Sequence, residues 1–379
     1  MTKKKISKKT YFEFFAGGGM ARLGLGEAWS CLFANDFDSQ KAAAYRENFG
    51  SEHFCEGDVA ALVPTDLPAA KPDLVWSSFP CQDLSLAGER RGLAGRRSSV
   101  FHAFWSLMKD LAAEGRAPTT IVLENVTGLL TSNDRRDIQS IIVALADEGY
   151  AVSALVLDAA RFVPQSRKRV FIFGLPYTAD FAQTPPPPSD ETPQALIDAV
   201  HGLPPRTIAA WRWLDARPRQ GRNIALADLL DESADRWHTR EQTERLVNAM
   251  SARQRAALEK RRGDGCDHVG AAFKRIRVEN GEKTMRVEAR FDGIAGCLRT
   301  PAGGSSRQII LAISNGDVRS RLLTPREAAR LMGVPDNYRL PNGATAALKL
   351  CGDGVATPVV RWIAETILTP ALAEQAAAA

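Results

Sequence analysis

The chain has 379 residues, of which 45% are hydrophobic and 25% charged, and its formal net charge is +5. This composition is typical of a globular protein and excludes a chain that is disordered throughout. No apolar run approaches the ~20 residues that span a bilayer, and no apolar stretch follows the basic N-terminus as in a signal peptide. We therefore expect a cytoplasmic protein that does not enter a membrane.

The cysteines and the basic residues bear on the redox state and on the kind of partner that we expect. The six cysteines, at positions 31, 55, 81, 266, 297 and 351, show no CxxC spacing, which favours reduced thiols and argues against a metal site. Basic residues gather in 206–262, with thirteen Lys and Arg against eight Asp and Glu, and in 88–97, with four arginines and one glutamate. Both segments are suited to phosphate contacts, although a solvated surface explains them equally well.

The first half of the chain alternates short apolar runs with segments of helical spacing. The apolar runs, which predict strands buried on both faces, are 10–15, 31–35, 73–78, 119–124, 151–157 and 169–174. Helical spacing occupies 99–113 and 137–148. Strands that alternate with helices predict an α/β fold with a doubly wound, mostly parallel sheet, which binds ligands beyond the carboxyl ends of its strands.

The second half has a different texture. The run 184–188 (TPPPP) indicates a stiff connector, and helical stretches are predicted near 224–231 and 239–261. Thr324 and Glu327 form a capping box that predicts the start of a helix. A last helix at about 356–368 carries apolar residues on one face.

A glycine-rich turn, FFAGGGMARLGLG (14–26), follows the first strand. Glycines at this place let a ligand approach the backbone. The strict dinucleotide fingerprint fails because the sixth position from Gly17 is Arg22. Asp36 ends the second strand, where a carboxylate can accept hydrogen bonds from ribose hydroxyls, and Asp58 follows a third strand and can accept from an exocyclic amine. These features predict an adenosine-like ligand.

The segment Ser78-Phe79-Pro80-Cys81-Gln82 ends the fourth apolar run. A thiolate beside arginines is a nucleophile, whereas a lone cysteine without such a setting is usually a small core residue. Glu124 ends the neighbouring strand, within reach of whatever Cys81 attacks. Arg167 and Arg169 precede the next apolar run, and their alternation predicts that they share a face.

Together these segments resemble the DNA cytosine-5 methyltransferases of bacterial type. The resemblance rests on six motifs in the family's order, namely FAGGG (15–19), FPCQ (79–82), ENV (124–126), QSRKR (165–169), LTPREAARLMGVPD (323–336) and GDGVATPVV (352–360). It covers most of the chain except about 176–290. In the last motif, Gly352-Asp353-Gly354 stands where relatives often show Gly-Asn-Ser.

The resemblance implies a Rossmann-like fold and an enzyme that transfers a methyl group from S-adenosylmethionine to carbon 5 of a flipped-out cytosine in duplex DNA. Cys81 would form a covalent adduct at carbon 6, Glu124 and Arg169 would bind the base, and Arg167 would support them. The implied cofactor residues are Phe15, Ala16, Gly17, Gly19, Asp36, Phe37, Asp58, Val59, Pro80, Val100, Asp353 and Gly354. The implied DNA-binding residues are Gln82, Ser85, Arg90, Arg91, Arg96, Arg97 and Gln165.

The same resemblance implies a division of the chain. It predicts a catalytic and cofactor-binding domain (1–175), a smaller target-recognition domain (176–340) and a C-terminal helical segment (341–379) that returns to the first domain. The tryptophans of the middle region suit either DNA contact or a small core. We expect a monomer that needs no metal, releases S-adenosylhomocysteine and acts on DNA in the bacterial nucleoid. Pairing with a restriction endonuclease is a further expectation.

Three other functions fit parts of the sequence. A tRNA cytosine-5 methyltransferase would share the Pro-Cys and Glu-Asn-Val motifs, and the nature of the methyl acceptor distinguishes it. A DNA-binding protein on a decayed methyltransferase scaffold would bind cofactor and DNA without forming a covalent adduct. A nicotinamide-dependent oxidoreductase accounts for the glycine turn and Asp36, but leaves Cys81, Glu124 and Arg169 unexplained.

Overall fold

The structure, a computed structural model, describes residues 8–80, 100–177, 184–218, 221–279, 281–300 and 307–378. The chain forms two compact units. Unit 1 comprises 1–157, 168–219 and 359–379, and unit 2 comprises 158–167 and 220–358. Within the described ranges, no helix is both long and apolar enough to cross a membrane.

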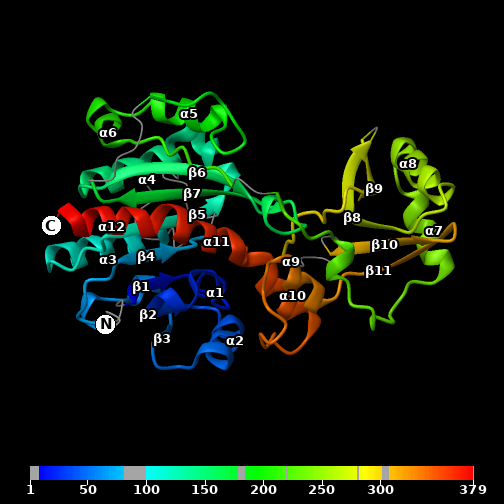
Figure 1. Ribbon diagram of the computed structural model, residues 1–379, viewed down its shortest axis with the longest axis horizontal. Helices are drawn as coiled ribbons and strands as arrows, with labels where there is room; N and C mark the ends of the chain where they lie inside the picture. Colours follow the sequence, from blue (N-terminus) through cyan, green and yellow to red (C-terminus); the bar gives the residue numbers. More distant parts are fainter. Residues whose placement is uncertain are drawn as a thin grey trace, which may run out of the picture. The chain divides into compact units, whose positions relative to one another are not determined.

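Unit 1 is built on a seven-stranded sheet with the order β3-β2-β1-β4-β5-β7-β6 (Figure 1). Its strands are β1 (Lys9–Phe14), β2 (Trp29–Asp36), β3 (Phe54–Glu56), β4 (Leu74–Ser77), β5 (Thr120–Val126), β6 (Ala151–Asp158) and β7 (Lys168–Leu175). The pairs from β3 to β5 are parallel, and β7 runs antiparallel to β5. The predicted doubly wound, mostly parallel sheet is confirmed.

Several helices accompany this sheet in unit 1. They are α1 (Met20–Leu25), α2 (Ser39–Phe49), α3 (Val100–Ala113), α4 (Arg136–Asp147), α5 (Gln194–His201), α6 (Pro205–Ala210) and α12 (Thr369–Ala378), while α11 (Thr357–Ile363) begins in unit 2. Both α5 and α6 contact α4. In α3, Phe104, Leu107 and Leu111 recur at helical spacing and are buried in the main core. The C-terminal helix begins beside the first strand, since Lys9 Nζ lies 3.5 Å from Thr369 Oγ1.

The sheet of unit 1 reverses its direction of strand addition between β1 and β4. The chain adds β2 and β3 on one side of β1, and then crosses to β4 and β5 on the other. At such a reversal the connections after the two central strands diverge and leave room for a ligand. The segments that follow β1 and β4 therefore bound the expected site.

Unit 2 contains a four-stranded antiparallel sheet with the order β11-β10-β8-β9. Its strands are β8 (His268–Glu279), β9 (Glu282–Arg290), β10 (Gln308–Ser314) and β11 (Asp317–Leu322), and its helices are α7 (Arg240–Asn248), α8 (Ala252–Arg262), α9 (Pro325–Leu331) and α10 (Ala344–Asp353). A small core of Leu246, Met250, Val287, Ile309 and Leu311 joins α7 to the sheet.

Two predicted helices differ from the observed ones. The stretch 239–261 is two helices, because Ser251 and Gln254 form a second capping box that starts α8. The stretch near 224–231 holds only a 3₁₀ turn, Ala227–Leu229. The capping box at Thr324 and Glu327 is confirmed at the start of α9.

Candidate active site

The glycine-rich turn connects β1 to α1. Gly17 and Gly19 have φ values of +56° and +76°, in the left-handed region. A Cβ atom at Gly19 would lie 2.4 Å from Phe49 Cε2, so a larger residue there would have to displace that ring. Phe15 also has a positive φ, of +56°, which is strained for an aromatic residue and is typical of ligand sites. The backbone N–H of Ala16 donates to Asn35 O at 2.9 Å and joins the turn to β2.

Asp36 fastens the end of β2 to this turn. Its carboxylate is 5% exposed and accepts the N–H of Gly17 at 2.8 Å and that of Asp38 at 2.9 Å. Burial raises the pKa of Asp36, while both backbone donors favour its charged form. The next side chain, Phe37, is 68% exposed. The pair thus presents a hydrogen-bond acceptor beside an open aromatic face.

The chain after β3 lies alongside. The Asn35 amide donates to Cys55 O at 3.1 Å and to Gly57 O at 3.0 Å, which joins this segment to β2. Asp58 is exposed and caps a 3₁₀ turn by accepting the N–H of Ala60 at 2.9 Å, and Val59 is buried beneath it. The turn, the end of β2 and the Asp58 segment are thereby held together by hydrogen bonds.

The end of β5 and the start of β7 bring together Glu124 and Arg169. Arg169 Nε lies 3.1 Å from Glu124 Oε1, and the side chains are 15% and 8% exposed. They meet because β7 runs antiparallel to β5, with Arg169 paired to Val126 in register. Asn125 Nδ2 donates to Phe79 O at 3.0 Å, which ties the end of β5 to the segment after β4. Sequence reasoning predicted that these strands are neighbours but missed this amide bond.

The other residues predicted to bind the cofactor lie in several segments of the chain. Pro80 is exposed after β4, and Val100 packs against the main core at the start of α3. Phe15 lies with its ring centroid 6.4 Å from that of Phe104. In unit 2, Asp353 accepts a hydrogen bond from the Thr300 hydroxyl. The predicted residues outside the described ranges are Cys81, Gln82, Ser85, Arg90, Arg91, Arg96 and Arg97.

Arg167 is a buried junction within unit 2. Its guanidinium donates to the carbonyl oxygens of Leu298 at 3.0 Å, Gly352 at 2.9 Å and Gly354 at 2.5 Å. Because β7 begins at Lys168, the alternation expected of a strand does not extend to Arg167. The side chain instead secures the Gly352-Asp353-Gly354 segment.

Gln165 is fully buried in the same unit. Its amide nitrogen donates to Leu331 O at 2.8 Å, and its oxygen accepts the N–H of Leu298 at 3.1 Å. These bonds join three segments that are distant in the sequence. A DNA contact by Gln165 would require this packing to open.

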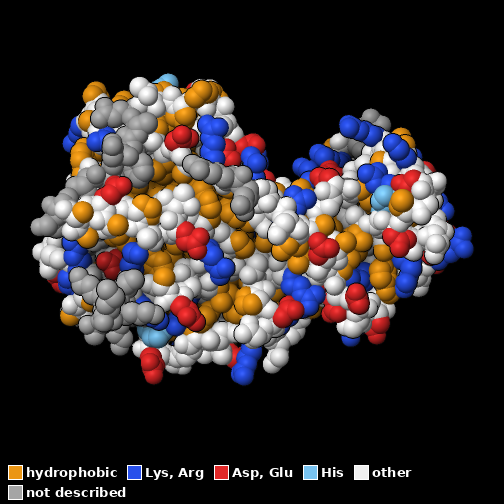
Figure 2. Space-filling view, viewed as in Figure 1, with side chains coloured by type: hydrophobic (Ala, Val, Ile, Leu, Met, Phe, Trp, Pro, Cys, Tyr) orange, Lys and Arg blue, Asp and Glu red, His pale blue; other side chains and the backbone are white. Residues whose placement is uncertain are grey.

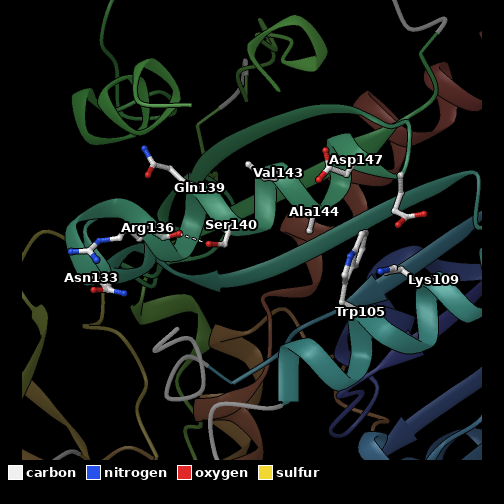
Figure 3. A pocket seen from close by; sticks show the side chains of 10 residues that line it. Trp105, Lys109, Asn133, Arg136, Gln139, Ser140, Val143, Ala144 and Asp147 are labelled. Carbon is white, nitrogen blue, oxygen red and sulfur yellow. Dashed lines mark hydrogen bonds between the residues drawn. The ribbon is translucent and has the colours of Figure 1, made fainter. Parts of the chain in front are cut away.

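A separate surface pocket of about 550 Å³ lies between α3 and α4 (Figure 3). Trp105 and Lys109 line it from α3, and Arg136, Ser140 and Asp147 line it from α4. Ser140 Oγ donates to the Arg136 carbonyl at 2.8 Å, and Asp147 forms an ion pair with Arg206 at 3.2 Å. Its lining includes none of the predicted site residues, so this hollow and the predicted chemistry are in different places.

Comparison with known proteins agrees with this arrangement. Residues 10–369 match the family model of the C-5 cytosine-specific DNA methylases. The chain is 29% identical to the Type II methyltransferase M.NlaX of Neisseria lactamica, over 93% of this chain and 94% of that protein. It is 28% identical to M.DsaV of Dactylococcopsis salina, over 97% of this chain and 88% of that one.

Solved structures show the same fold at lower identity. A DNMT2 mutant of Spodoptera frugiperda has a TM-score of 0.64 at 15% identity, and the match covers 96% of this chain and 100% of that one. The S. pombe Dnmt2 methyltransferase has a TM-score of 0.60 at 16% identity, with coverages of 96% and 99%. The family match spans nearly the whole length, and so the chain belongs to the C-5 cytosine-specific DNA methylases.

Proposed function

We propose that this DNA cytosine-5 methyltransferase acts through a covalent adduct of Cys81 with a flipped-out cytosine. The observation that carries the proposal is the Glu124–Arg169 pair at the ends of β5 and β7. Asn125, the residue after Glu124, is bonded to Phe79, two residues before Cys81 in the sequence. The acid and guanidinium that we propose to bind the base therefore lie next to the segment that leads to the proposed nucleophile.

The turn and the end of β2 fit S-adenosylmethionine. The backbone is open at Gly17, Asp36 has lone pairs beyond the two N–H bonds that it accepts, and the face of Phe37 is exposed. Asp36 would hold the ribose hydroxyls, Phe37 would pack on the adenine, and Asp58 would accept from its amino group. When bound, the cofactor supplies an electrophilic methyl group on a sulfonium.

The protein's own groups would activate the cytosine. The Cys81 thiolate adds to carbon 6, which breaks the aromaticity and raises the electron density at carbon 5. Carbon 5 then takes the methyl group. Loss of the carbon 5 proton to a base and expulsion of the Cys81 thiolate restore the ring. Division into addition and elimination replaces one high barrier by lower ones.

Glu124 and Arg169 would hold the ring during these steps. Glu124 contacts ring nitrogen 3 and the exocyclic amine, and a proton shared between its carboxyl group and nitrogen 3 stabilises the negative charge that develops there. Arg169 donates to the oxygen on carbon 2. Both side chains retain some exposure, which suits contact with a base that enters from outside the protein.

Unit 2 supplies a surface suited to duplex DNA. The distal part of the β8–β9 hairpin extends past β10, because β10 pairs with β8 only from His268 to Phe273. One face of this extension carries Arg275 directly opposite Arg286, and Arg277 follows on the same face. Glu288 on the same face forms ion pairs with Arg275 at 3.6 Å and with Arg277 at 2.6 Å. With three guanidinium groups and this one carboxylate, the cluster keeps a positive charge that suits an anionic partner. Figure 2 shows basic side chains gathered over the β8–β9 and α8 part of this unit.

The remaining parts of the proposal concern the cellular setting. Duplex DNA in the bacterial nucleoid is the proposed substrate, S-adenosylhomocysteine the product, and no metal is required. We further propose a monomer that modifies its DNA alongside a restriction endonuclease, as the names of the bacterial Type II relatives suggest. The target-recognition function is assigned to the part of the chain around β8–β9.

The test is transfer of labelled methyl groups. The protein, Cys81→Ser and the control Cys266→Ser, a substitution at an exposed cysteine, are incubated with radiolabelled S-adenosylmethionine and plasmid DNA, which is then digested to nucleosides. Label in 5-methylcytosine with the wild type and the control, but less than about a hundredth with Cys81→Ser, supports the mechanism. Label in tRNA but not DNA would overturn the substrate, and an active Cys81→Ser would overturn the adduct.

A further inference from the structure

Beneath the glycine turn, unit 1 contains a buried polar cluster that the reaction does not use. Glu13 on β1 is 1% exposed, and Oε2 of its carboxyl group has no hydrogen-bond partner among the described residues. The carboxyl group interacts with the backbone N–H of Arg22, in the first turn of α1. That helix has Gly19 at its N-cap and lacks a side-chain cap. Glu13 therefore interacts with the Arg22 N–H group in place of a capping side chain.

The side chain of Arg22 extends from α1 to α2 and to the segment before β3. Its Nη1 lies 2.9 Å from Tyr45 Oη and 2.7 Å from His53 Nε2. The guanidinium also lies over the ring of Phe49, 4.6 Å from its centroid. Phe49 is the ring that closes on Gly19, so Arg22 holds in place the side chain against which the turn packs.

We infer that Glu13 and Arg22 are positioning residues for the cofactor, with the buried Glu13 side chain supporting the start of α1 and Arg22 holding Phe49 under the turn. This inference rests on the proposed function, because the turn is taken as the cofactor site. Neither residue touches the cofactor in this account. Both act by holding the backbone conformation of the turn at Gly17 and Gly19.

The surroundings of Glu13 explain why it remains uncharged. Desolvation raises the pKa of Glu13 to about 8, with the Arg22 guanidinium opposing the rise and the Asp36 carboxylate adding to it. The other titratable groups that face the cluster are Tyr11 on β1, Cys31 on β2 and Tyr45 on α2, together with His53. Burial raises the pKa of each of these phenols and of the thiol, and lowers that of His53, so at neutral pH they are uncharged as well. Arg22 is the cation of the cluster and Asp36 its anion.

A second carboxylate here would compete with Asp36. Negative charge at Glu13 would favour the protonated form of Asp36 and so weaken its hold on the Gly17 N–H. An uncharged acid keeps the acceptor for the Arg22 N–H without this repulsion. Glutamine has the same shape, the same acceptor and no charge, and it is therefore the conservative replacement.

The test compares Glu13→Gln, Glu13→Leu and Arg22→Met with the wild type in the full-length protein. Glu27→Gln is the control, since Glu27 is an exposed acid just after α1. Affinity for S-adenosylmethionine is measured by calorimetry, and affinity for a DNA duplex is measured separately. Loss of a cap-like contact corresponds to a roughly five- to tenfold weaker cofactor affinity for Glu13→Leu and Arg22→Met. DNA affinity and the Glu27→Gln variant should stay at wild-type values, and Glu13→Gln should recover most of the loss.

Hydrogen exchange gives a readout that needs no ligand. In the cofactor-free protein, amides of residues 16–25 should exchange faster in Glu13→Leu and Arg22→Met, and at near wild-type rates in Glu13→Gln. Unchanged exchange in the first two variants would overturn the inference. Glu13→Gln behaving like Glu13→Leu would overturn the role of an uncharged acid. If exchange changes as expected but the wild type does not bind S-adenosylmethionine, the proposed function fails, while the support of the turn by Glu13 and Arg22 stands.

Discussion

Each unit contains a glutamate–arginine ion pair with little exposure to solvent. The two pairs differ in how many of their hydrogen-bond acceptors are occupied. In unit 2, Glu327 and Arg321 are 1% and 3% exposed, and Glu327 also accepts the N–H groups of Asp231 and Thr324. In unit 1, Glu124 and Arg169 are 8% and 15% exposed. The first pair has its acceptors filled by its own unit, whereas the second has capacity left for a substrate. The same kind of ion pair thus stabilises the fold of unit 2 and, in the proposed mechanism, holds the base in unit 1.

The largest expected effect is a loss of catalytic rate when the glutamate of the unit 1 pair is changed. Glu124→Gln replaces an acid that can transfer a proton to the cytosine by an amide that cannot, and kcat should fall by roughly 10²–10⁴-fold. Cofactor affinity should change little, because Glu124 lies outside the segments proposed to hold the cofactor. Thermal stability should change little, because glutamine can still accept a hydrogen bond from Arg169. Steady-state kinetics and calorimetry check this, with Glu114→Gln, an exposed acid after α3, as the control. Retained kcat in Glu124→Gln would remove Glu124 from the mechanism.

The second expected effect is on stability. Arg321→Met leaves the carboxylate of Glu327 buried without its cation, which should lower the free energy of unfolding of unit 2 by about 3–5 kcal/mol. Arg330→Met is the matched control, since its partner Asp336 is 61% exposed and such surface pairs contribute about 0–1 kcal/mol. Urea unfolding followed by tryptophan fluorescence measures both. Equal losses in the two variants would show that burial does not distinguish these pairs.

The third expectation concerns Glu13, the buried acid under the glycine turn of unit 1. Burial keeps Glu13 protonated, whereas Glu327 in unit 2 is charged. Its pKa is about 8 in the folded state against an ordinary value of 4.5. Because the folded protein holds the proton more tightly, this proton stabilises it fully below about pH 4.5, and the contribution is lost as pH rises to 8. The slope is about 1.4 kcal/mol per pH unit at most. Unfolding free energies of the wild type and Glu13→Gln, measured from acid to alkaline pH, should diverge by this slope between about pH 4.5 and 8 and run parallel below and above that range.

The smallest effect is expected at the β8–β9 extension. Replacing Arg275, Arg277 and Arg286 by alanine should weaken DNA binding about tenfold and reduce the slope of log K against log salt by up to about 3. The same charge change in unit 1, at Lys71, Arg135 and Arg206, is the control. Fluorescence anisotropy over a salt series gives both slopes. An equal change in the two triple variants would assign the effect to net charge alone.

Much of the site in unit 1 is predictable because its residues end strands. Asp36 and Glu124 follow apolar runs, and a parallel sheet brings such ends to one edge. The bond from Asn125 to Phe79 is not predictable, since an amide after a strand has many possible partners. The sequence predicts that Arg167 alternates with Arg169, but the strand begins between them. In unit 2, the β8–β9 hairpin is not predicted from the sequence, and the exposure of its distal part depends on how far β10 extends.

The order of the segments in unit 1 has a consequence for synthesis. Its sheet is complete once residue 175 has emerged, but residues 359–379, which include α12, belong to the same unit. At the usual pace of translation, roughly 10–30 s pass while the intervening unit 2 is made. During that time the surface that receives the C-terminal helix is uncovered on the nascent chain. Chaperone binding to ribosome-bound chains should therefore peak before residue 359 emerges and fall once the last helix docks.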